Sequence, residues 1–192
     1  TWDQIREMSD YGWAFGDHTK EHRRLTEMSD DEIRESMESV NQSFLEQGFA
    51  LPAIMAYPYG AYDDRVIADI QSYRAQARLA DYETYFVDFE NNNPYAIDCI
   101  SADMHKKSQL NEVEKLVDKA CEEKAVIVFR VHTLYREEPY DTVPINKKIL
   151  SGCAPQTDSE LFRQLVEYCV DQGCSFMTMT QLIDIYPQNP AC

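Results

Sequence analysis

Two histidines four positions apart have the residue type and the spacing that metal-assisted chemistry requires. His18 and His22 lie in the segment Gly16–His22, directly after the apolar residues 13–15. Neutral imidazole is a common zinc ligand, and zinc with an open coordination position generates a hydrolytic nucleophile at neutral pH. If the segment is helical from Thr19, residues i and i+4 share a face and both imidazoles reach one ion. The competing interpretation is a pair of exposed polar residues on a surface turn, because such a pair also arises by chance.

Two more polar residues follow predicted strands. Tyr59 stands in a Pro-Tyr-Gly turn after the strand expected at residues 53–57, and His132 comes just past the apolar run 125–129. We expect His18 likewise at the end of a short strand. Because the active sites of α/β barrels gather at the carboxyl ends of strands, the sequence predicts that these residues belong to one site.

The elements that must position these residues alternate between helix and strand. Capping boxes predict three helix starts, because Thr1, Ser29 and Thr157 are each followed three residues later by Gln or Glu. Apolar residues at helical spacing predict further helices at residues 64–73, 110–120 and around 182. Short apolar runs predict strands at residues 13–16, 53–57, 77–80, 96–101, 125–129 and 176–179. Residues 133–156 are polar and contain prolines, so a long loop is expected there.

This alternation argues for an α/β fold of parallel βα units, arranged as an open sheet or a barrel. No G-x-G-x-x-G sequence follows a predicted strand and there is no P-loop, so a nucleotide-binding fold is unsupported. With 192 residues and 44% hydrophobic content, the chain is long enough for a single domain over residues 1–192. No apolar stretch approaches the length of a transmembrane helix.

The charge balance bears on the partner. There are 34 acidic and 18 basic residues, which gives a formal net charge of −16. This argues against a nucleic acid partner, because phosphate contacts need clustered Lys and Arg. A neutral or cationic partner, such as a partly deacetylated amino-sugar polymer, is electrostatically easier. The six cysteines form no C-x-x-C pair, and Cys121 falls among core-facing helix positions, which favours a buried small apolar residue.

Four segments, taken in order, resemble the motifs of one known family. Residues 16–22 resemble a histidine-pair metal motif, and residues 56–60 resemble an R-x-P-Y-G motif. Residues 126–132 look like a late strand that ends in a catalytic histidine, and residues 176–182 look like a closing F-x-T-L-x-x-L strand and helix. In this order the motifs are those of the polysaccharide deacetylases, the NodB-homology domain of carbohydrate esterase family four. The chain resembles that family along essentially its whole length.

The resemblance implies a distorted (β/α) barrel and a metal-dependent hydrolase that removes acetyl groups from N-acetylated sugars, as in chitin-like polymers, poly-N-acetylglucosamine or peptidoglycan. It implies that His18 and His22 ligate Zn²⁺ or another divalent ion. The Tyr59 backbone N–H would stabilise the oxyanion, and His132 would protonate the leaving amine as general acid. The implied substrate-binding residues are Tyr57, Pro58, Tyr59 and Gly60. It further implies an extracellular or cell-envelope location.

The chain also departs from the family pattern. The family's two adjacent aspartates, which supply the general base and a third metal ligand, have no counterpart, so we expect the first strands to be missing upstream of Trp2. Asp63-Asp64 follows the Pro-Tyr-Gly turn and is expected to cap a helix. Ala56 replaces the arginine of the third motif, and Asp98 and Asp103 are the candidates for the partner of the acid histidine. Two histidines alone leave a catalytic zinc one protein ligand short.

Two alternative functions therefore remain open at this stage. One is a catalytically impaired deacetylase-fold domain that binds carbohydrate or a protein partner, and the missing aspartates favour it. The other is a hydrolase of non-sugar amides on the same scaffold. The retained histidines favour the carbohydrate deacetylase.

Overall fold

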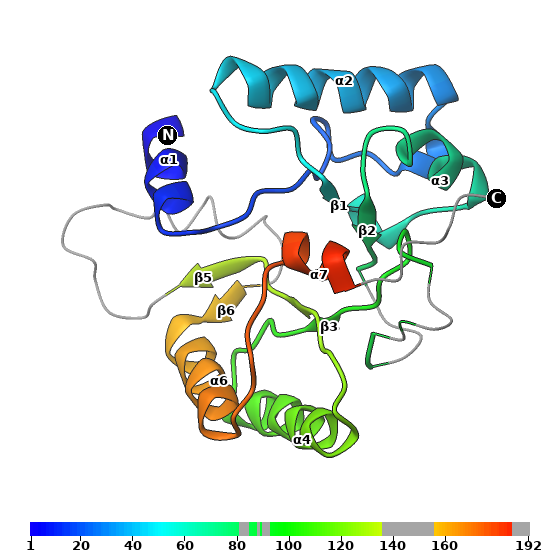
Figure 1. The fold of residues 1–192 in the computed structure, drawn as a ribbon. Helices are drawn as coiled ribbons and strands as arrows, with labels where there is room; N and C mark the ends of the chain where they lie inside the picture. The colour runs from blue at the N-terminus through cyan, green and yellow to red at the C-terminus, as the bar shows by residue number, and fades with distance from the viewer. Residues whose placement is uncertain (81–84, 88, 90–92, 136–155, 186–192) are drawn as a thin grey trace. The chain divides into compact units, whose positions relative to one another are not determined.

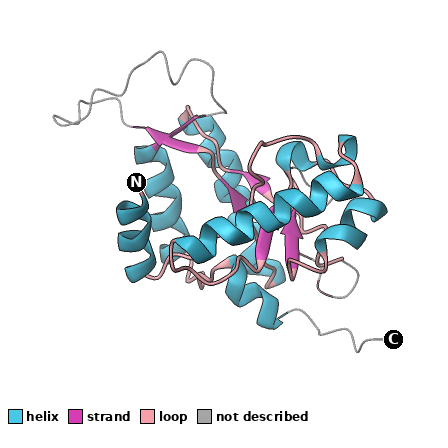
Figure 2. Ribbon diagram, turned by 90° about the horizontal axis from the view of Figure 1, so that it is seen from above, coloured by secondary structure: helices cyan, strands magenta, loops and turns pink. Residues whose placement is uncertain are grey.

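The computed structural model describes residues 1–80, 85–87, 89, 93–135 and 156–185 (Figure 1). These residues fall into two compact units. The first unit comprises Thr1–Glu83, Val87–Asp98 and Phe176–Cys192, and the second comprises Thr84–Phe86 and Cys99–Ser175. In the described part of the chain the α-helices are longer than the strands, which have two or three residues each (Figure 2).

The first unit is built around four short parallel segments. Its elements are α1 (Trp2–Asp10), η1 (Leu25–Glu27), α2 (Asp30–Glu46), β1 (Ile54–Ala56), η2 (Pro58–Gly60), α3 (Asp64–Ile70), β2 (Gln76–Arg78) and α7 (Met179–Ile185). β1 pairs in parallel with β2. Asp17 bridges Met55 on one side of this pair and Ile97 bridges Arg78 on the other, both in parallel. His18 therefore follows directly on a residue that is hydrogen-bonded to β1.

Helices α2 and α3 pack against this small sheet because each has one apolar face. The core of the first unit consists of buried residues from both helices, both strands and the segment before α2: Leu25, Met28, Ile33, Met37, Met55, Tyr57, Val66, Ile70, Ala77 and Leu79. Thr1 and Ser29 form the predicted capping boxes, each accepting from the backbone N–H of the residue three positions later. Asp63 caps α3, as expected.

The second unit contains β3 (Ile100–Ser101), α4 (Lys107–Glu123), β4 (Phe129–Arg130), β5 (Thr133–Tyr135), β6 (Gln156–Asp158) and α6 (Ser159–Asp171). β3 pairs in parallel with β4, and β5 pairs in parallel with β6. The apolar faces of α4 and α6 share one core with the segment after β3, made of Ala102, Met104, Leu110, Val113, Val117, Leu165 and Cys169.

Two of the predicted strands are wrong. Residues 13–16 are not a buried strand, because Trp13 is 62% exposed and only Asp17 pairs with β1. Phe15 instead packs against the ring of Phe49, with 5.7 Å between the ring centroids. Residues 176–179 are not a strand either. The apolar run there leads into a helix, because Thr178 and Gln181 cap the start of α7 reciprocally.

The N-cap of the last long helix is Asp158, one residue after the predicted cap, Thr157. The Asp158 side chain accepts from the backbone N–H groups of Glu160 and Leu161 and is the N-cap of α6. The Thr157 hydroxyl instead contacts the carbonyl oxygen of Ala102 at 3.3 Å and Oδ1 of Asp103 at 3.1 Å. The loop expected at residues 133–156 is bounded by the paired strands β5 and β6, and its residues 136–155 lie outside the described residues.

The α/β class is confirmed by the alternation of helices with parallel strand pairs. In the described ranges, however, these strands form separate pairs and do not close into the predicted barrel. Residues 125–128 precede β4 and are only half-buried, so this run is less enclosed than its apolar sequence predicts. No helix in the described part of the chain is long and apolar enough to cross a membrane.

Candidate active site

A tight loop, and not a helix, brings the two histidines together. Thr19 and His22 both have left-handed backbone conformations, with φ values of 62° and 54°. The Thr19 hydroxyl accepts a hydrogen bond from the His22 N–H at 3.0 Å. The Nε2 atoms of His18 and His22 consequently lie 3.0 Å apart. The helical geometry considered for this segment is wrong, but the two imidazoles do converge.

The ring of His18 is held in one orientation by the main chain of β1. Its Nδ1 lies 2.7 Å from the carbonyl oxygen of Ala56, which can only accept, so Nδ1 carries the proton. The lone pair of His18 is therefore on Nε2, which faces His22. An Nδ1–H bond to a backbone carbonyl is the arrangement that commonly orients a metal-binding histidine.

Both electrostatics and solvation keep this ring neutral. Loss of water around the ring lowers the pKa of His18 below its ordinary value of 6.5, and the electrostatic effects of the neighbouring His22 and Arg78 lower it further. They outweigh the Ala56 carbonyl and Asp17, which act in the opposite direction. A neutral imidazole at pH 7 is the form that can ligate a cation.

A buried ion pair anchors the start of the loop. The Arg74 Nε and Nη2 atoms lie 3.0 and 2.6 Å from Oδ2 of Asp17, and both side chains are 0% exposed. The other carboxylate oxygen, Oδ1, accepts from the Thr19 N–H at 2.6 Å. Arg74 also donates to Asn41 of α2 at 2.8 Å. Sequence reasoning missed this pair because its members are 57 positions apart and no local pattern links them.

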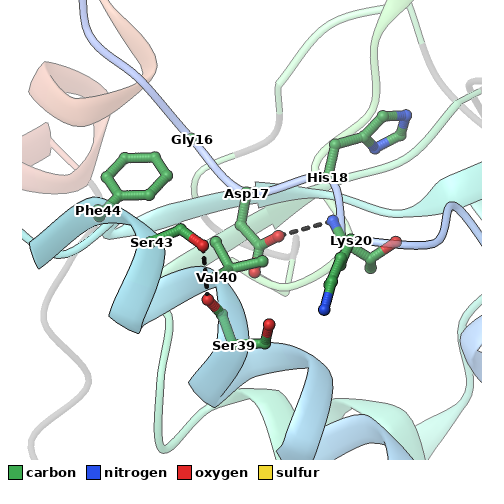
Figure 3. Close-up of a pocket in the computed structure, with 9 residues that line it drawn as sticks. Gly16, Asp17, His18, Lys20, Ser39, Val40, Ser43 and Phe44 are labelled. Carbon is green, nitrogen blue, oxygen red and sulfur yellow. Dashed lines mark hydrogen bonds between the residues drawn. The ribbon is translucent and has the colours of Figure 1, made fainter. Parts of the chain in front are cut away.

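A pocket of about 230 Å³ lies between this loop and α2. It is lined by Gly16, Asp17, His18, Thr19, Lys20, Ser39, Val40, Ser43 and Phe44. In Figure 3 the imidazole of His18 points away from Ser39 and Ser43 of α2. The pocket therefore lies on the α2 side of the loop, away from the imidazole of His18.

The Pro-Tyr-Gly turn lies beside the histidine pair. The ring of Tyr59 meets that of His22 edge-on, with 4.7 Å between the centroids, and is 58% exposed. The Arg24 guanidinium carbon lies 4.6 Å from the centre of the Tyr59 ring on the same exposed surface. Arg24 was not among the predicted site residues, and the sequence offers no signal for it beyond its position two residues after His22.

The backbone of this turn depends on Gly60. Tyr59 and Gly60 both have positive φ values, 58° and 66°. A Cβ atom on Gly60 would lie 2.9 Å from Cβ of Ala80, so only glycine fits both the conformation and the space. Pro58 is buried at the start of the turn. Among the described residues none accepts a hydrogen bond from the Tyr59 N–H.

Tyr57 does not fit its predicted role as a substrate contact. It is 1% exposed, its hydroxyl donates to the carbonyl of Tyr95 at 2.9 Å, and its ring stacks on that of Tyr62. Burial raises the pKa of the Tyr57 hydroxyl well above its ordinary value of 10. Tyr57 is a core residue that supports the turn from below.

In the second unit, His132 is paired with Asp103. Its Nδ1 lies 2.7 Å from Oδ2 of Asp103, and its backbone N–H donates to Oδ1 at 2.9 Å. Ser101 and Thr157 donate to the same carboxylate, at 3.1 Å each. Asp103 is thus the partner of His132, and Asp98, the other candidate, belongs to the first unit. The arrangement leaves Nε2 of His132 as the nitrogen that can exchange a proton with a substrate.

The Asp103 carboxylate should stabilise the second unit in a pH-dependent manner. Burial raises the pKa of Asp103, but the hydrogen bonds from His132 and Ser101 outweigh it and hold the pKa below its ordinary value of 3.8. Asp103→Asn is therefore expected to lower the free energy of unfolding at pH 7 by about 1.5–3 kcal/mol, the usual range for hydrogen bonds to a charged group. Because Asp103 has a lower pKa in the folded state than in the unfolded state, this contribution to stability is fully present above pH 3.8. It is lost as the pH falls through the pKa of Asp103 in the folded state.

Urea unfolding of the wild type and of Asp103→Asn between pH 7 and pH 3 measures this contribution. The difference in the free energy of unfolding between the wild type and Asp103→Asn should become smaller as the pH approaches 3. A gap that is absent at pH 7, or that widens on acidification, would contradict the assigned pairing.

The facing imidazoles can act as two ligands of a divalent ion. Both Nε2 lone pairs would repel each other unless a proton or a cation lies between them, and the anchored tautomer of His18 already presents its lone pair. Within the described ranges no cluster of three or more His, Cys, Asp and Glu side chains could hold a metal ion. The donor set therefore fits an ion as a pair of imidazoles, to which further ligands must be added.

Comparison with known proteins gave one family match. The family model described as polysaccharide deacetylase matches residues 1–77, the part of the chain that holds His18, His22 and Tyr59. No curated protein matches the sequence. Among solved structures, the Streptococcus pyogenes deacetylase PplD in complex with acetate is similar over 51% of this chain, with 22% identity and a TM-score of 0.46. The alignment spans 42% of that deacetylase's length.

Proposed function

We propose, from the match of residues 1–77 to the polysaccharide deacetylase family model, that this protein is a metal-dependent hydrolase of N-acetyl groups on sugars. The observation that supports this best is the pair of Nε2 atoms 3.0 Å apart, one of them fixed by an Nδ1–H bond to β1. In a domain of this family, such a pair is where a hydrolytic metal would be held. The family match favours neither of the two alternative functions.

His18 and His22 would hold the ion, Zn²⁺ or another divalent metal. When bound, such an ion polarises an acetyl carbonyl and lowers the pKa of a water molecule. The role of the surrounding residues is to hold the imidazoles in a fixed orientation in which they can bind the ion. The Ala56 carbonyl, the left-handed loop and the Asp17–Arg74 pair together do this.

Tyr59 would stabilise the negative charge that develops on the carbonyl oxygen. Its left-handed conformation, set between Pro58 and Gly60, leaves its N–H without a protein acceptor among the described residues. A backbone donor held rigidly in this way costs no reorganisation when the charge forms, and the loss of one such donor typically reduces kcat by about 10²–10³. The exposed Tyr59 ring offers a flat face to a sugar, next to the Arg24 guanidinium.

His132 would protonate the leaving amine through Nε2. Asp103 accepts the hydrogen bond from Nδ1–H of His132 and so orients the ring with Nε2 free to carry the proton that is given up. The substrate class that fits is a neutral or amine-bearing glycan, since an acidic chain of net charge −16 repels polyanions.

Acetate release tests the proposal. The protein, supplied with Zn²⁺, Co²⁺ or Mn²⁺, is incubated with chitin oligosaccharides, a poly-N-acetylglucosamine and peptidoglycan, and free acetate is measured. Release from at least one of these, abolished by a chelator and restored by the metal, is the expected result. Metal binding without acetate release from any of the three would contradict the proposed activity and favour a carbohydrate-binding role.

A further inference from the structure

Three thiols of the second unit lie together at the ends of two helices. Cys121 is in the last turn of α4, Cys169 is in the last turn of α6, and Cys174 follows α6. Gly173, with a φ of 77°, turns the chain back so that the Cys174 N–H donates to the Cys169 carbonyl at 2.9 Å. The Sγ atoms of Cys121 and Cys174 are 3.6 Å apart, and both thiols are free.

We propose that Cys121 and Cys174 form a redox-active pair that a small-molecule disulfide converts into a disulfide bond between α4 and the segment after α6. The two sulfur atoms need to approach by about 1.5 Å to reach the disulfide bond length of about 2.05 Å. Neither residue takes part in the proposed deacetylation. The inference is therefore independent of that activity.

Exposure decides which of the three thiols reacts first. Cys121 is exposed, so the prediction that it is buried is wrong. Cys174 is half-buried, whereas Cys169 is 3% exposed and packs in the core of the second unit. Burial, together with the neighbouring Cys174, raises the pKa of the Cys169 thiol to about 11. Since the thiolate is the nucleophile, Cys169 stays an inert core thiol and Cys121 is the entry point.

The reaction is a pair of exchange steps. The Cys121 thiolate attacks the reagent disulfide RSSR, which forms a mixed disulfide Cys121–S–SR and releases RS⁻, protonated to RSH. Cys174 then loses its proton and attacks the Cys121 sulfur, which expels a second RSH. Two protein thiols are oxidised and one reagent disulfide is reduced to two thiols, so atoms and electrons balance.

The consequence is a covalent link between residues 53 positions apart. Closing a loop of this length restricts the unfolded chain and stabilises the folded unit. For a chain of this size, a stabilisation of the usual magnitude for a disulfide corresponds to a rise in Tm of about 5–10 °C.

The experiment is to treat the whole purified protein with oxidised glutathione and to map disulfides by mass spectrometry after trypsin digestion without reductant. Cys121 falls in the tryptic peptide 120–124, and Cys174 falls in the peptide 164–192 together with Cys169 and Cys192. The expected product is the 120–124 peptide linked to the 164–192 peptide, accompanied by a rise in Tm that dithiothreitol reverses.

Single variants identify the partner of Cys121. The crosslink should persist in Cys169→Ala and Cys192→Ala and disappear in Cys174→Ala, whose Tm should no longer respond to the oxidant. The proposal would be overturned if Cys121 could still be alkylated after treatment with oxidised glutathione, or if it carried only a glutathione adduct. A crosslink that survives Cys174→Ala would do the same.

Discussion

Replacing His18 and His22 together with alanine is expected to remove the divalent ion from the purified protein and to reduce acetate release by roughly 10³-fold or more. The size of the effect follows because metal polarisation supplies several kcal/mol of transition-state stabilisation and each 1.36 kcal/mol is a factor of ten in rate. Metal content by elemental analysis and initial rates of acetate release are the two measurements.

A matched control is available on the same chain. His105 is exposed, lies in the second unit and precedes α4, so His105→Ala removes an imidazole without touching the histidine pair. It should keep both metal and rate. Metal content that is unchanged in the double variant would disprove the ligand assignment. Loss of metal with an unchanged rate would instead show that hydrolysis does not depend on this ion.

The second large effect is expected on stability. Asp17→Ala should lower the free energy of unfolding by about 3–5 kcal/mol, because it leaves the fully buried Arg74 guanidinium without its charged partner. Asp3→Ala is the control. It removes a carboxylate from the surface pair with Arg6, where Asp3 is 90% exposed, and should cost about 0–1 kcal/mol. Urea unfolding curves of the two variants and the wild type give the comparison.

A double variant shows how much of the stability lost in Asp17→Ala comes from the unpaired charge and how much from the lost side-chain volume. Asp17→Leu combined with Arg74→Met removes both charges together, so it should recover much of the stability that Asp17→Ala loses. A loss below about 1 kcal/mol in Asp17→Ala would show that the ion pair is not the anchor inferred for the loop. Recovered stability with weak metal binding in the double variant would show that the pair orients the histidines as well.

Local signals in the sequence predicted much of the fold. The caps at Thr1 and Ser29 and the strand at residues 54–56 were predictable because each depends on neighbours within a few positions. The apolar run 13–16 was misleading because the residue that pairs with β1 is Asp17, which follows the run. No local pattern indicates that pairing. At residues 176–179 the competing signal was the Thr178–Gln181 cap, which favours helix over strand.

The candidate site shows the same division. Spacing brought His18 and His22 into consideration, but the loop that joins them depends on left-handed residues that no helical pattern predicts. The pairing of His132 with Asp103 spans 29 positions and was reached only as one of two candidates, through the resemblance. The Asp17–Arg74 pair and Arg24 depend on tertiary contacts alone, so sequence reasoning could not find them.

The bond from His18 to the Ala56 carbonyl makes one functional contact independent of side-chain identity. Any residue that keeps the strand conformation at position 56 presents the same oxygen, so Ala56 keeps this contact although it stands in place of the arginine of the R-x-P-Y-G motif. The constraint instead falls on chain length. An insertion or deletion between residues 48 and 53 that shifted the register of β1 by one residue would turn that carbonyl to the opposite edge. The His18 contact therefore constrains the register of β1 and not the side chain at position 56.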